Sequence, residues 1–562
     1  MTNPPRIAAE EYLEALSAQG IEHLFCNPGT DFAPIVEAFA RAARSNRVVP
    51  RPMVVPHENA AVGMAHGYTM VTGKPQAVML HTNVGTANSI NMLINASRDR
   101  VPILLTSGRT PFTESGAEGS RNAHIHWAQE MYDQAGMLRE MVKWDYEMKR
   151  GDQAGAVVDR ALELATSSPQ GPVYLSLPRE VLGEAIETAP SNRAHRARPR
   201  APVPSPADIE LLVRWIAEAR NPLIITGMLG RDPRESVVLS RLADRFALPV
   251  VPYNTRYFAL SANHPMFQGT APGPLLEEAD LVIVFESDVP WIPSKEAPRA
   301  GAKVVQIGED PLHARLPMRG FPSDLTITAT SLSVLEALEQ ALTDSAMRYV
   351  AERHAALTAR SRTLHQGWQD EVERAGRANT ISLPWLNHCL RGVVNRDTLV
   401  ISEYSFRQEY CPLDAPGGLF ALSTAGGLGW GFPASLGAKL AAPEKMVISV
   451  LGDGAYMFAN PTACHYTAQF QDLPVLTVIY NNSLYGAVRR ATLDMYGSGV
   501  AADGNGRLLA DLGAPAFEKI VAAHNGHGER VERPADLPAA LQRAADAVRG
   551  GQQALVNVVC PP

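Results

Sequence analysis

The stretch Val447-Ile-Ser-Val-Leu-Gly-Asp-Gly454 is followed, after 26 further residues, by the pair Asn481-Asn482. It predicts a buried strand that ends in a tight turn and a helix, and residues 475–480 predict the next strand. Ligands of open α/β sheets bind at the carboxyl ends of strands, so we expect Asp453 and the asparagines at one site. Glycines let backbone N–H groups approach a diphosphate, and Asp and Asn oxygens suit Mg2+. Separately, each motif reads as an ordinary turn or strand end; their spacing favours a magnesium–diphosphate site.

The rest of the chain also alternates short apolar runs with longer helical patterns, which is typical of parallel sheets covered by helices on both faces. The predicted strands occupy residues 77–81, 103–107 and 173–177, then 223–226, 281–285 and 304–307, and finally 399–402, 447–450, 475–479 and 554–558. A chain of 562 residues exceeds the roughly 250–300 residues that one hydrophobic core supports. The predicted fold class is therefore α/β, with three doubly wound parallel-sheet domains.

The domain boundaries follow from composition. Residues 184–206 contain five prolines and four arginines, which indicates a linker. Residues 345–377 form a polar helical stretch that leads into the last α/β segment. We therefore expect domains at residues 1–183, 205–342 and 380–562, the first and third being similar in size.

Composition excludes several classes of protein. Apolar residues make up 46% of the chain, charged residues 19%, and the formal net charge is −7, without a Lys/Arg cluster. A nucleic-acid partner is not expected. No run of about 18 apolar residues and no apolar signal core is present, so we expect no membrane partner and a cytoplasmic location. The five cysteines are scattered without CxxC spacing, which favours neither a disulfide framework nor a zinc site.

The motifs together resemble the thiamine-diphosphate enzymes of the pyruvate decarboxylase, acetolactate synthase and benzoylformate decarboxylase superfamily. The resemblance extends over nearly the whole chain and implies pyrimidine-binding, middle and diphosphate-binding domains. It implies thiamine diphosphate and Mg2+ as cofactors, with the metal held by Asp453, Asn482 and the carbonyl of Leu484. The cofactor-binding residues that it implies are Glu58, Gly426, Leu428, Gly452, Asp453, Gly454, Ala455, Asn482, Leu484 and Tyr485.

Two further segments carry the resemblance. Pro56-His-Glu-Asn-Ala-Ala-Val-Gly-Met-Ala-His-Gly-Tyr68 is similar to the segment of the family's essential glutamate, which activates the aminopyrimidine and so promotes ylide formation. That residue is Glu58 here; alternatively, a glutamate that opens a helix only complements the helix dipole. Ser423-Thr-Ala-Gly-Gly-Leu-Gly-Trp-Gly-Phe-Pro433 resembles the loop whose carbonyl, at Gly426, holds the aminopyrimidine and whose apolar residue, Leu428, bends the cofactor.

Other fragments favour the benzoylformate decarboxylase branch: Cys26-Asn-Pro-Gly-Thr30, residues 80–88, residues 142–147 and residues 481–488. The resemblance implies that Thr30 contacts the substrate carboxylate and that His81 is an active-site acid or base. With Glu58, these are the predicted catalytic residues. Residues 284–293 lack the second histidine of that branch, and small residues follow Tyr485, so an aromatic substrate is not assured.

His126-Trp-Ala-Gln-Glu130 instead resembles a segment of acetolactate synthases, but the middle segment lacks their Arg-Phe-Asp-Asp stretch, so FAD is not expected. The leading hypothesis is a non-oxidative decarboxylase and carboligase that acts on a small 2-oxo acid through ylide and enamine intermediates. Alternatives are an acetolactate-synthase-like transferase, a lyase of 2-hydroxyacyl-CoA or oxalyl-CoA, and a catalytically silent homologue. The resemblance also implies a homodimer or homotetramer with active sites between subunits.

Overall fold

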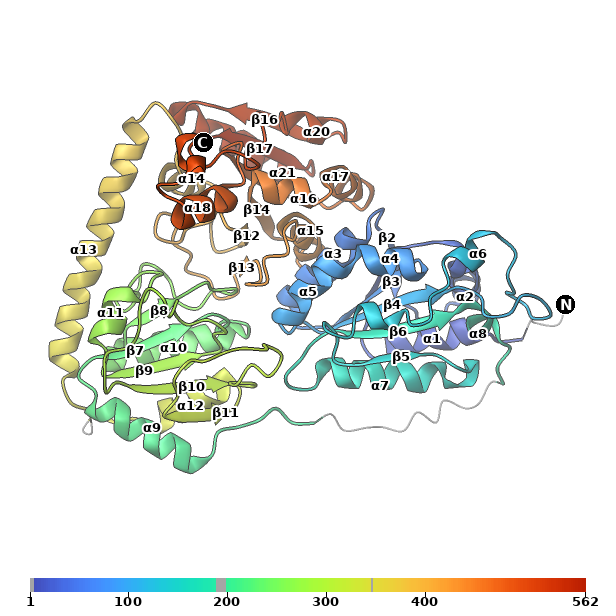
Figure 1. Ribbon diagram of the computed structural model, residues 1–562, viewed down its shortest axis with the longest axis horizontal. Helices are drawn as coiled ribbons and strands as arrows, with labels where there is room; N and C mark the ends of the chain where they lie inside the picture. Colours follow the sequence, from blue (N-terminus) through green and yellow to red (C-terminus); the bar gives the residue numbers. More distant parts are fainter. Residues whose placement is uncertain (1–4, 188–198, 345–346, 562) are drawn as a thin grey trace.

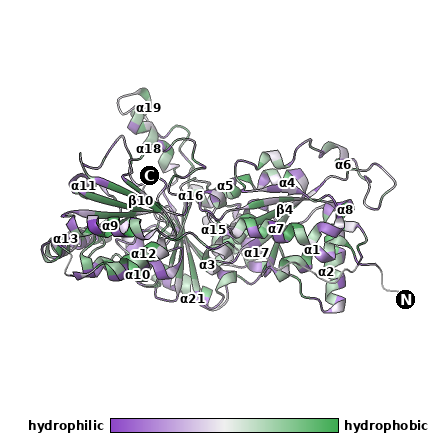
Figure 2. Cartoon of the chain, turned by 90° about the horizontal axis from the view of Figure 1, so that it is seen from below, coloured by the Kyte–Doolittle hydropathy of each residue, from purple (hydrophilic) through white to green (hydrophobic). Residues whose placement is uncertain are grey.

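The computed structural model describes residues 5–187, 199–344 and 347–561, so residues 188–198 of the predicted linker lie outside the described part. In the described residues, the named strands form three sheets in which every ladder is parallel (Figure 1). Helices cover both faces of the sheets, whose buried strands are mostly green in Figure 2 because they carry apolar side chains. The predicted fold class is confirmed.

The first sheet has the order β2-β1-β3-β4-β6-β5. Its strands are β1 (His23–Asn27), β2 (Arg51–Val54), β3 (Gln76–Leu80), β4 (Ile103–Arg109), β5 (Asp145–Glu147) and β6 (Val173–Pro178). The surrounding helices are α1 (Ala8–Ala18), α2 (Ala33–Ser45), α3 (Glu58–Thr72), α4 (Thr82–Asn88), α5 (Ile90–Arg98), α6 (Ile125–Ala128), α7 (Ala154–Thr166) and α8 (Arg179–Gly183). The order reverses between β1 and β3, so the carboxyl ends of these two strands form the switch point where such sheets bind ligands.

The third sheet has the order β13-β12-β14-β15-β17-β16, which repeats the order of the first sheet strand for strand. Its strands are β12 (Thr398–Glu403), β13 (Leu419–Ala421), β14 (Met446–Gly452), β15 (Leu476–Asn481), β16 (His527–Val531) and β17 (Ala554–Val559). Its helices are α14 (Leu383–Leu390), α15 (Gly431–Ala441), α16 (Asp453–Phe458), α17 (Pro461–Phe470), α18 (Gly486–Met495), α19 (Val500–Asp503), α20 (Glu518–Ala522) and α21 (Leu537–Arg549). The switch point of this sheet lies between β12 and β14, where Asp453 begins α16.

The middle sheet has the order β11-β10-β9-β7-β8. Its strands are β7 (Pro222–Thr226), β8 (Val250–Pro252), β9 (Leu281–Phe285), β10 (Lys303–Gly308) and β11 (Leu325–Thr328). Its helices are α9 (Pro206–Glu218), α10 (Pro233–Phe246), α11 (Gly273–Glu278) and α12 (Ser331–Ala341). The long helix α13 (Val350–Arg377) then runs along the outside of the molecule from the middle domain to the third domain (Figure 1).

The first and third domains pack together through α3 and α15. A Cβ on Gly67 would lie 2.1 Å from the carbonyl oxygen of Ala434, and one on Gly437 would lie 2.0 Å from that of Met64. The two helix backbones therefore touch where these glycines lie. One continuous cluster of buried apolar residues extends through both domains and includes Phe25 of the first and Trp430 of the third.

A buried polar junction joins all three domains. The side chain of Arg256, from the middle domain, contacts Asp99 of the first domain and Asp288 of its own domain. Asp288 in turn accepts a hydrogen bond from the hydroxyl of Thr424, in the third domain. In the part of the chain that the structure describes, no helix is long and apolar enough to cross a membrane.

Candidate active site

The ends of β14 and β15 bring together the residues predicted to bind metal. The backbone N–H of Leu484 lies 3.3 Å from Oδ2 of Asp453 and 3.2 Å from Oδ1 of Asn482, so the two side-chain oxygens converge on one point. The Leu484 carbonyl accepts a 2.9 Å bond from Gly486 N–H and keeps a second lone pair. A carboxylate, an amide oxygen and a carbonyl form a donor set that fits a hard cation such as Mg2+.

Asp453 is buried and accepts hydrogen bonds from backbone N–H groups, and among the described residues it forms no ion pair. Burial raises the pKa of its carboxyl, and backbone N–H groups, including that of Gly454 at 2.7 Å, oppose the rise. The ring of Tyr485 packs so closely on Gly454 that a Cβ there would lie 2.9 Å from two ring carbons. Gly452 ends β14, and Ala455 lies in the first turn of α16, so these residues all line the same turn.

Glu58 lies in the first domain, as the first residue of α3. It is partly buried, and its Oε2 accepts a 2.9 Å hydrogen bond from the amide of Asn88. Among the described residues, no hydrogen bond or ion pair joins Glu58 or His81 to Asp453 or Asn482. Within one chain the predicted residues therefore form separate groups, one in each of the two outer domains.

Thr30 and His81 lie at the switch point of the first sheet, because Thr30 follows β1 and His81 follows β3. Nδ1 of His81 is hydrogen-bonded to the carboxylate of Asp31, and Nε2 lies 3.4 Å from the side-chain nitrogen of Gln129. Asp31 directly follows Thr30 in the sequence but lies outside the motifs described above. Gln129 lies in a quoted motif, but its contact with His81 depends on the tertiary fold.

Asparagines of α5 hold the loop that contains Gly426 and Leu428. Asn91 donates a 2.9 Å hydrogen bond to the Leu428 carbonyl, and Asn95 exchanges two hydrogen bonds with Gly427. Gly426 has a φ of +67°, and no described residue donates a hydrogen bond to its carbonyl. This loop is thus fixed from the first domain of the same chain, with the Gly426 carbonyl left for a ligand.

A second buried carboxylate supports this loop. Glu403, at the end of β12, accepts hydrogen bonds of 2.8 Å and 2.6 Å from the N–H groups of Gly429 and Gly431. Burial raises its pKa to about 7, against the opposing effect of these bonds. The next residue, Tyr404, has a φ of +74°, and its hydroxyl lies 3.4 Å from where a Cβ on Gly426 would stand. Neither residue was selected from the sequence.

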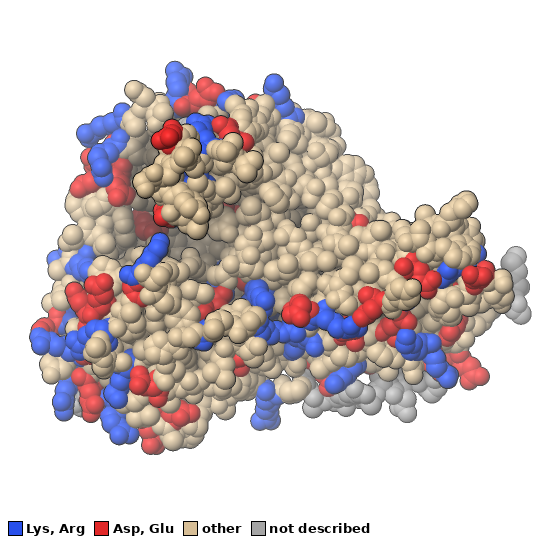
Figure 3. Space-filling view, in the orientation of Figure 1, with Lys and Arg blue, Asp and Glu red and all other residues tan. Residues whose placement is uncertain are grey.

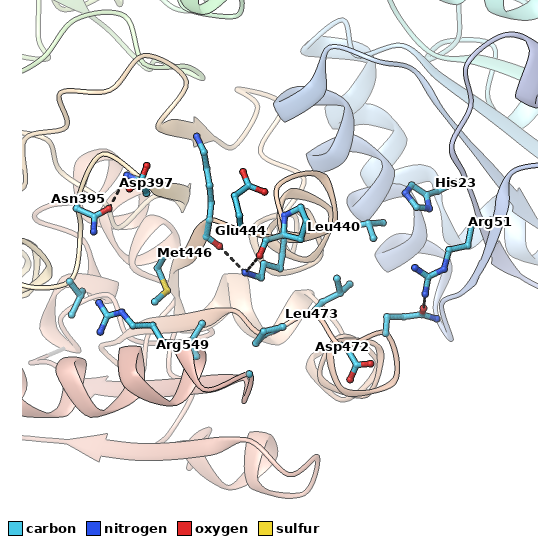
Figure 4. Close-up of a pocket in the computed structure, with 18 residues that line it drawn as sticks. His23, Arg51, Asn395, Asp397, Leu440, Glu444, Met446, Asp472, Leu473 and Arg549 are labelled. Carbon is cyan, nitrogen blue, oxygen red and sulfur yellow. Dashed lines mark hydrogen bonds between the residues drawn. The ribbon is translucent and has the colours of Figure 1, made fainter.

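A large pocket of about 770 Å³ also lies between the first and third domains (Figure 4). His23 and Arg51 line one side of it, and Met446 and Arg549 line the other. His23, Arg51 and Met446 are the first residues of their strands, so the pocket lies at the amino ends of both sheets. Since doubly wound sheets bind ligands at the carboxyl ends, this pocket is not the candidate active site.

Comparisons with known proteins agree with this arrangement. The N-terminal, central and C-terminal domain models of thiamine pyrophosphate (thiamine diphosphate) enzymes match residues 8–137, 209–338 and 403–558. The benzoylformate decarboxylase of Pseudomonas aeruginosa is 28% identical over 85% of this chain and 86% of its own length. The acetolactate synthase isozyme 3 large subunit of Escherichia coli is 24% identical over 98% of this chain and 94% of its own length.

Among solved structures, the thiamine diphosphate-dependent 4-hydroxybenzoylformate decarboxylase of Rhodococcus jostii RHA1 has the same fold. Its TM-score is 0.81, at 21% identity and 99% coverage of both chains. The chain therefore belongs to the thiamine pyrophosphate enzymes, as its motifs indicated. Within them it is similar to decarboxylases and acetolactate synthases.

Proposed function

We propose that this protein is a thiamine-diphosphate- and Mg2+-dependent non-oxidative decarboxylase and carboligase of a 2-oxo acid. The observation that carries the proposal is the position of Thr30 and His81, which follow the neighbouring strands β1 and β3 at the switch point of the first sheet. The likeness to a benzoylformate decarboxylase over most of both chains supports it.

The residues of the third domain would bind the cofactor's diphosphate and metal. Asp453, Asn482 and the Leu484 carbonyl would hold Mg2+, whose charge would neutralise the buried carboxylate and favour binding of the diphosphate. The backbone of Gly452, Gly454 and Ala455 would approach the phosphates closely. When bound, thiamine diphosphate supplies a carbon nucleophile and an electron sink for the carboxylate that leaves as CO2.

Glu58, Gly426 and Leu428 would hold the aminopyrimidine. The carboxyl of Glu58 would hydrogen-bond a ring nitrogen and exchange a proton there, while the Gly426 carbonyl accepts from the amino group. Leu428 is partly buried against the core that joins the two domains, so it offers a firm apolar support for a bent cofactor. The hydrogen bond from Asn91 to the Leu428 carbonyl holds the backbone at this residue.

Thr30 and His81 would act on the substrate. The exposed Thr30 hydroxyl would bind the substrate carboxylate, and the imidazole of His81 would deliver a proton to the carbon that has lost CO2, which yields an aldehyde. If a second carbonyl compound takes the place of the proton, the same residues yield a 2-hydroxyketone.

A specific contact favours the acetolactate-synthase-like transferase as second candidate. Gln129 belongs to the segment His126–Glu130 that resembles acetolactate synthases, and it lies 3.4 Å from Nε2 of His81. A side-chain amide at this place can bind the carbonyl of an acceptor.

The active site is proposed to form between two copies of the chain. Each copy has Glu58 in its first domain and Asp453 in its third domain. Among the described residues, no hydrogen bond connects the two within one chain. The face in Figure 3 is largely free of charge over the region of α4, α16 and α17. Large apolar side chains are exposed on these helices, namely Val84, Met457, Phe458, Tyr466 and Phe470. A second copy would bury them, which gives a homodimer or a dimer of dimers.

The test of the proposed reaction is a product analysis. The purified enzyme, loaded with thiamine diphosphate and Mg2+, is incubated with a panel of 2-oxo acids, with and without aldehyde or 2-oxo acid acceptors. The proposal predicts CO2 and an aldehyde without acceptor. Products that form only when a second 2-oxo acid is present favour the transferase. If the enzyme turns over acyl-CoA substrates and no 2-oxo acid, both the decarboxylase and the transferase proposals are contradicted.

A further inference from the structure

The carboxylate of Asp31 and the imidazole of His81 form a hydrogen-bonded pair in the first domain. Oδ1 of Asp31 bonds to Nδ1 of His81, while Oδ2 lies 3.4 Å from the backbone N–H of Thr82. Asp31 is only 2% exposed, and no Lys or Arg side chain forms an ion pair with it among the described residues. Its one charged or ionisable partner is therefore His81.

Two glycines make room for this pair. A Cβ on Gly29 would lie 2.0 Å from Nδ1 of His81, and a Cβ on Gly108, in the central strand β4, would lie 1.6 Å from Oδ2 of Asp31. Any side chain at either position would occupy the space that the pair now fills. The residue after His81, Thr82, also has an unusual φ of +33°, which turns the chain directly after the imidazole. The backbone at Gly29, Gly108 and Thr82 thus accommodates the contact between Asp31 and His81.

The contact fixes which nitrogen of His81 is available. A carboxylate only accepts hydrogen bonds, so Nδ1 of His81 carries the hydrogen that the pair requires. Nε2 is then the atom that changes its protonation state, and it faces Gln129 rather than a charged group. His81 is partly buried, so a small substrate can still approach it.

We propose that Asp31 is a positioning residue for His81: its buried carboxylate fixes the Nδ1–H tautomer, so that Nε2 delivers the proton to the substrate and regains it from water. The inference rests on the proposed function, because it assigns a role to the same His81. Asp31 itself does not touch the substrate.

The charges around His81 act in the same direction. The hydrogen bond that His81 donates to Asp31 raises the pKa of the imidazole, its partial burial opposes this, and the charges of Asp31 and Glu58 add to the rise. His126, which also interacts with His81, has its own pKa lowered by burial and by the charges of Arg179 and Arg121. His81 therefore remains a proton donor at a higher pH than a free histidine.

The test is a 15N NMR titration of the histidines in the full-length enzyme, with His81 assigned by comparison with His81→Ala. In the wild-type enzyme above its titration midpoint, the 15N shifts should report hydrogen on Nδ1 of His81. In Asp31→Asn the midpoint should move to lower pH, and Gly29→Ala should move it likewise because its methyl group displaces Nδ1. Asp133→Asn, an exposed carboxylate of the same domain, is the matched control and should leave the midpoint unchanged.

The same variants are then assayed across pH. The kcat of Asp31→Asn should fall more steeply with rising pH than that of the wild-type enzyme, so that its deficit is about tenfold larger at pH 8 than at pH 6, because less His81 is protonated there. Hydrogen on Nε2 in the wild-type enzyme, or an unshifted midpoint in both variants, overturns the pairing. If the titration midpoint of His81 shifts in Asp31→Asn but the pH profile of kcat does not, the proposed role of the Asp31–His81 pair in catalysis is overturned. Because the titration needs neither cofactor nor substrate, a failure of the proposed reaction leaves the pairing separately tested.

Discussion

Nε of Arg256 in the middle domain lies 3.4 Å from Oδ1 of Asp99 in the first domain, and both side chains are fully buried. The other end of the guanidinium contacts Asp288. Asp288 accepts a hydrogen bond from the hydroxyl of Thr424, which lies in the loop that contains Gly426 and Leu428. The guanidinium of Arg256 thus connects the middle domain to the first domain directly and to the third domain through Asp288 and Thr424. Thr424 is two residues before Gly426. The middle domain, which provides none of the predicted catalytic residues, supports the loop that would hold the aminopyrimidine.

Replacing Arg256 by alanine should strongly destabilise the protein. Removal of one partner of a buried ion pair leaves uncompensated charges and typically costs about 3–5 kcal/mol. Here both Asp99 and Asp288 would lose their cation. The measurement is urea unfolding, with Arg234→Ala as control because Arg234 is an exposed arginine of the same domain. Equal losses in the two variants would contradict a structural role of the junction.

The contribution of Asp99 to the stability of the protein should fall as pH rises from about 4 to about 6. Burial raises the pKa of Asp99 to about 6, against the attraction of Arg256. A carboxyl whose pKa is higher in the folded than in the unfolded state binds more protons when folded, so deprotonation costs stability, by up to about 3 kcal/mol. Asp288 does not contribute in this range: burial alone would raise its pKa, but Arg256 and Thr424 together outweigh burial and lower the pKa to about 2.

The variant Asp99→Asn tests this dependence. It cannot ionise, so the free energy of unfolding should change less between pH 4 and pH 7 than in the wild-type protein. Asp145→Asn, at a surface ion pair of the first domain, is the control. The same slope in Asp99→Asn and in the wild-type protein would show that another group titrates.

The metal site predicts a variant that folds but does not retain its cofactor. Asp453→Ala removes the one carboxylate of the donor set, so the affinity for thiamine diphosphate in the presence of Mg2+ should fall at least tenfold. Isothermal titration calorimetry measures this, with circular dichroism to confirm the fold. Wild-type affinity with unchanged magnesium dependence would exclude Asp453 as a ligand.

Assembly can be tested by sedimentation together with activity. One chain has a mass of 60.7 kDa, and the proposed active site needs two copies. Activity should therefore decline at concentrations where the dimer dissociates, and Phe470→Asp, on the exposed apolar face of α17, should raise that concentration. Full activity in a sample that sediments only as monomer would rule out a shared site.

Much of the fold was predictable because the central strands are continuous apolar runs. Edge strands such as β2 and β16 carry mostly exposed or half-buried side chains and escaped prediction. The predicted residues Asp453 and Asn482 were recognisable because a short motif and its spacing place them at strand ends. Asp31 and Glu403 were not, because their roles arise from contacts with His81 and Gly431, which are distant in sequence.

We propose that Glu58 activates a bound thiamine diphosphate and that His81 acts afterwards. The most direct measurement is hydrogen–deuterium exchange at the reactive carbon of the cofactor in the loaded enzyme, followed by quenched NMR, alongside steady-state turnover. Glu58→Gln should slow the exchange and all turnover, since an amide cannot exchange the activating proton. His81→Ala should exchange nearly normally while kcat falls by about 10²–10⁴-fold. Wild-type exchange in Glu58→Gln, or normal turnover in His81→Ala, would contradict the account.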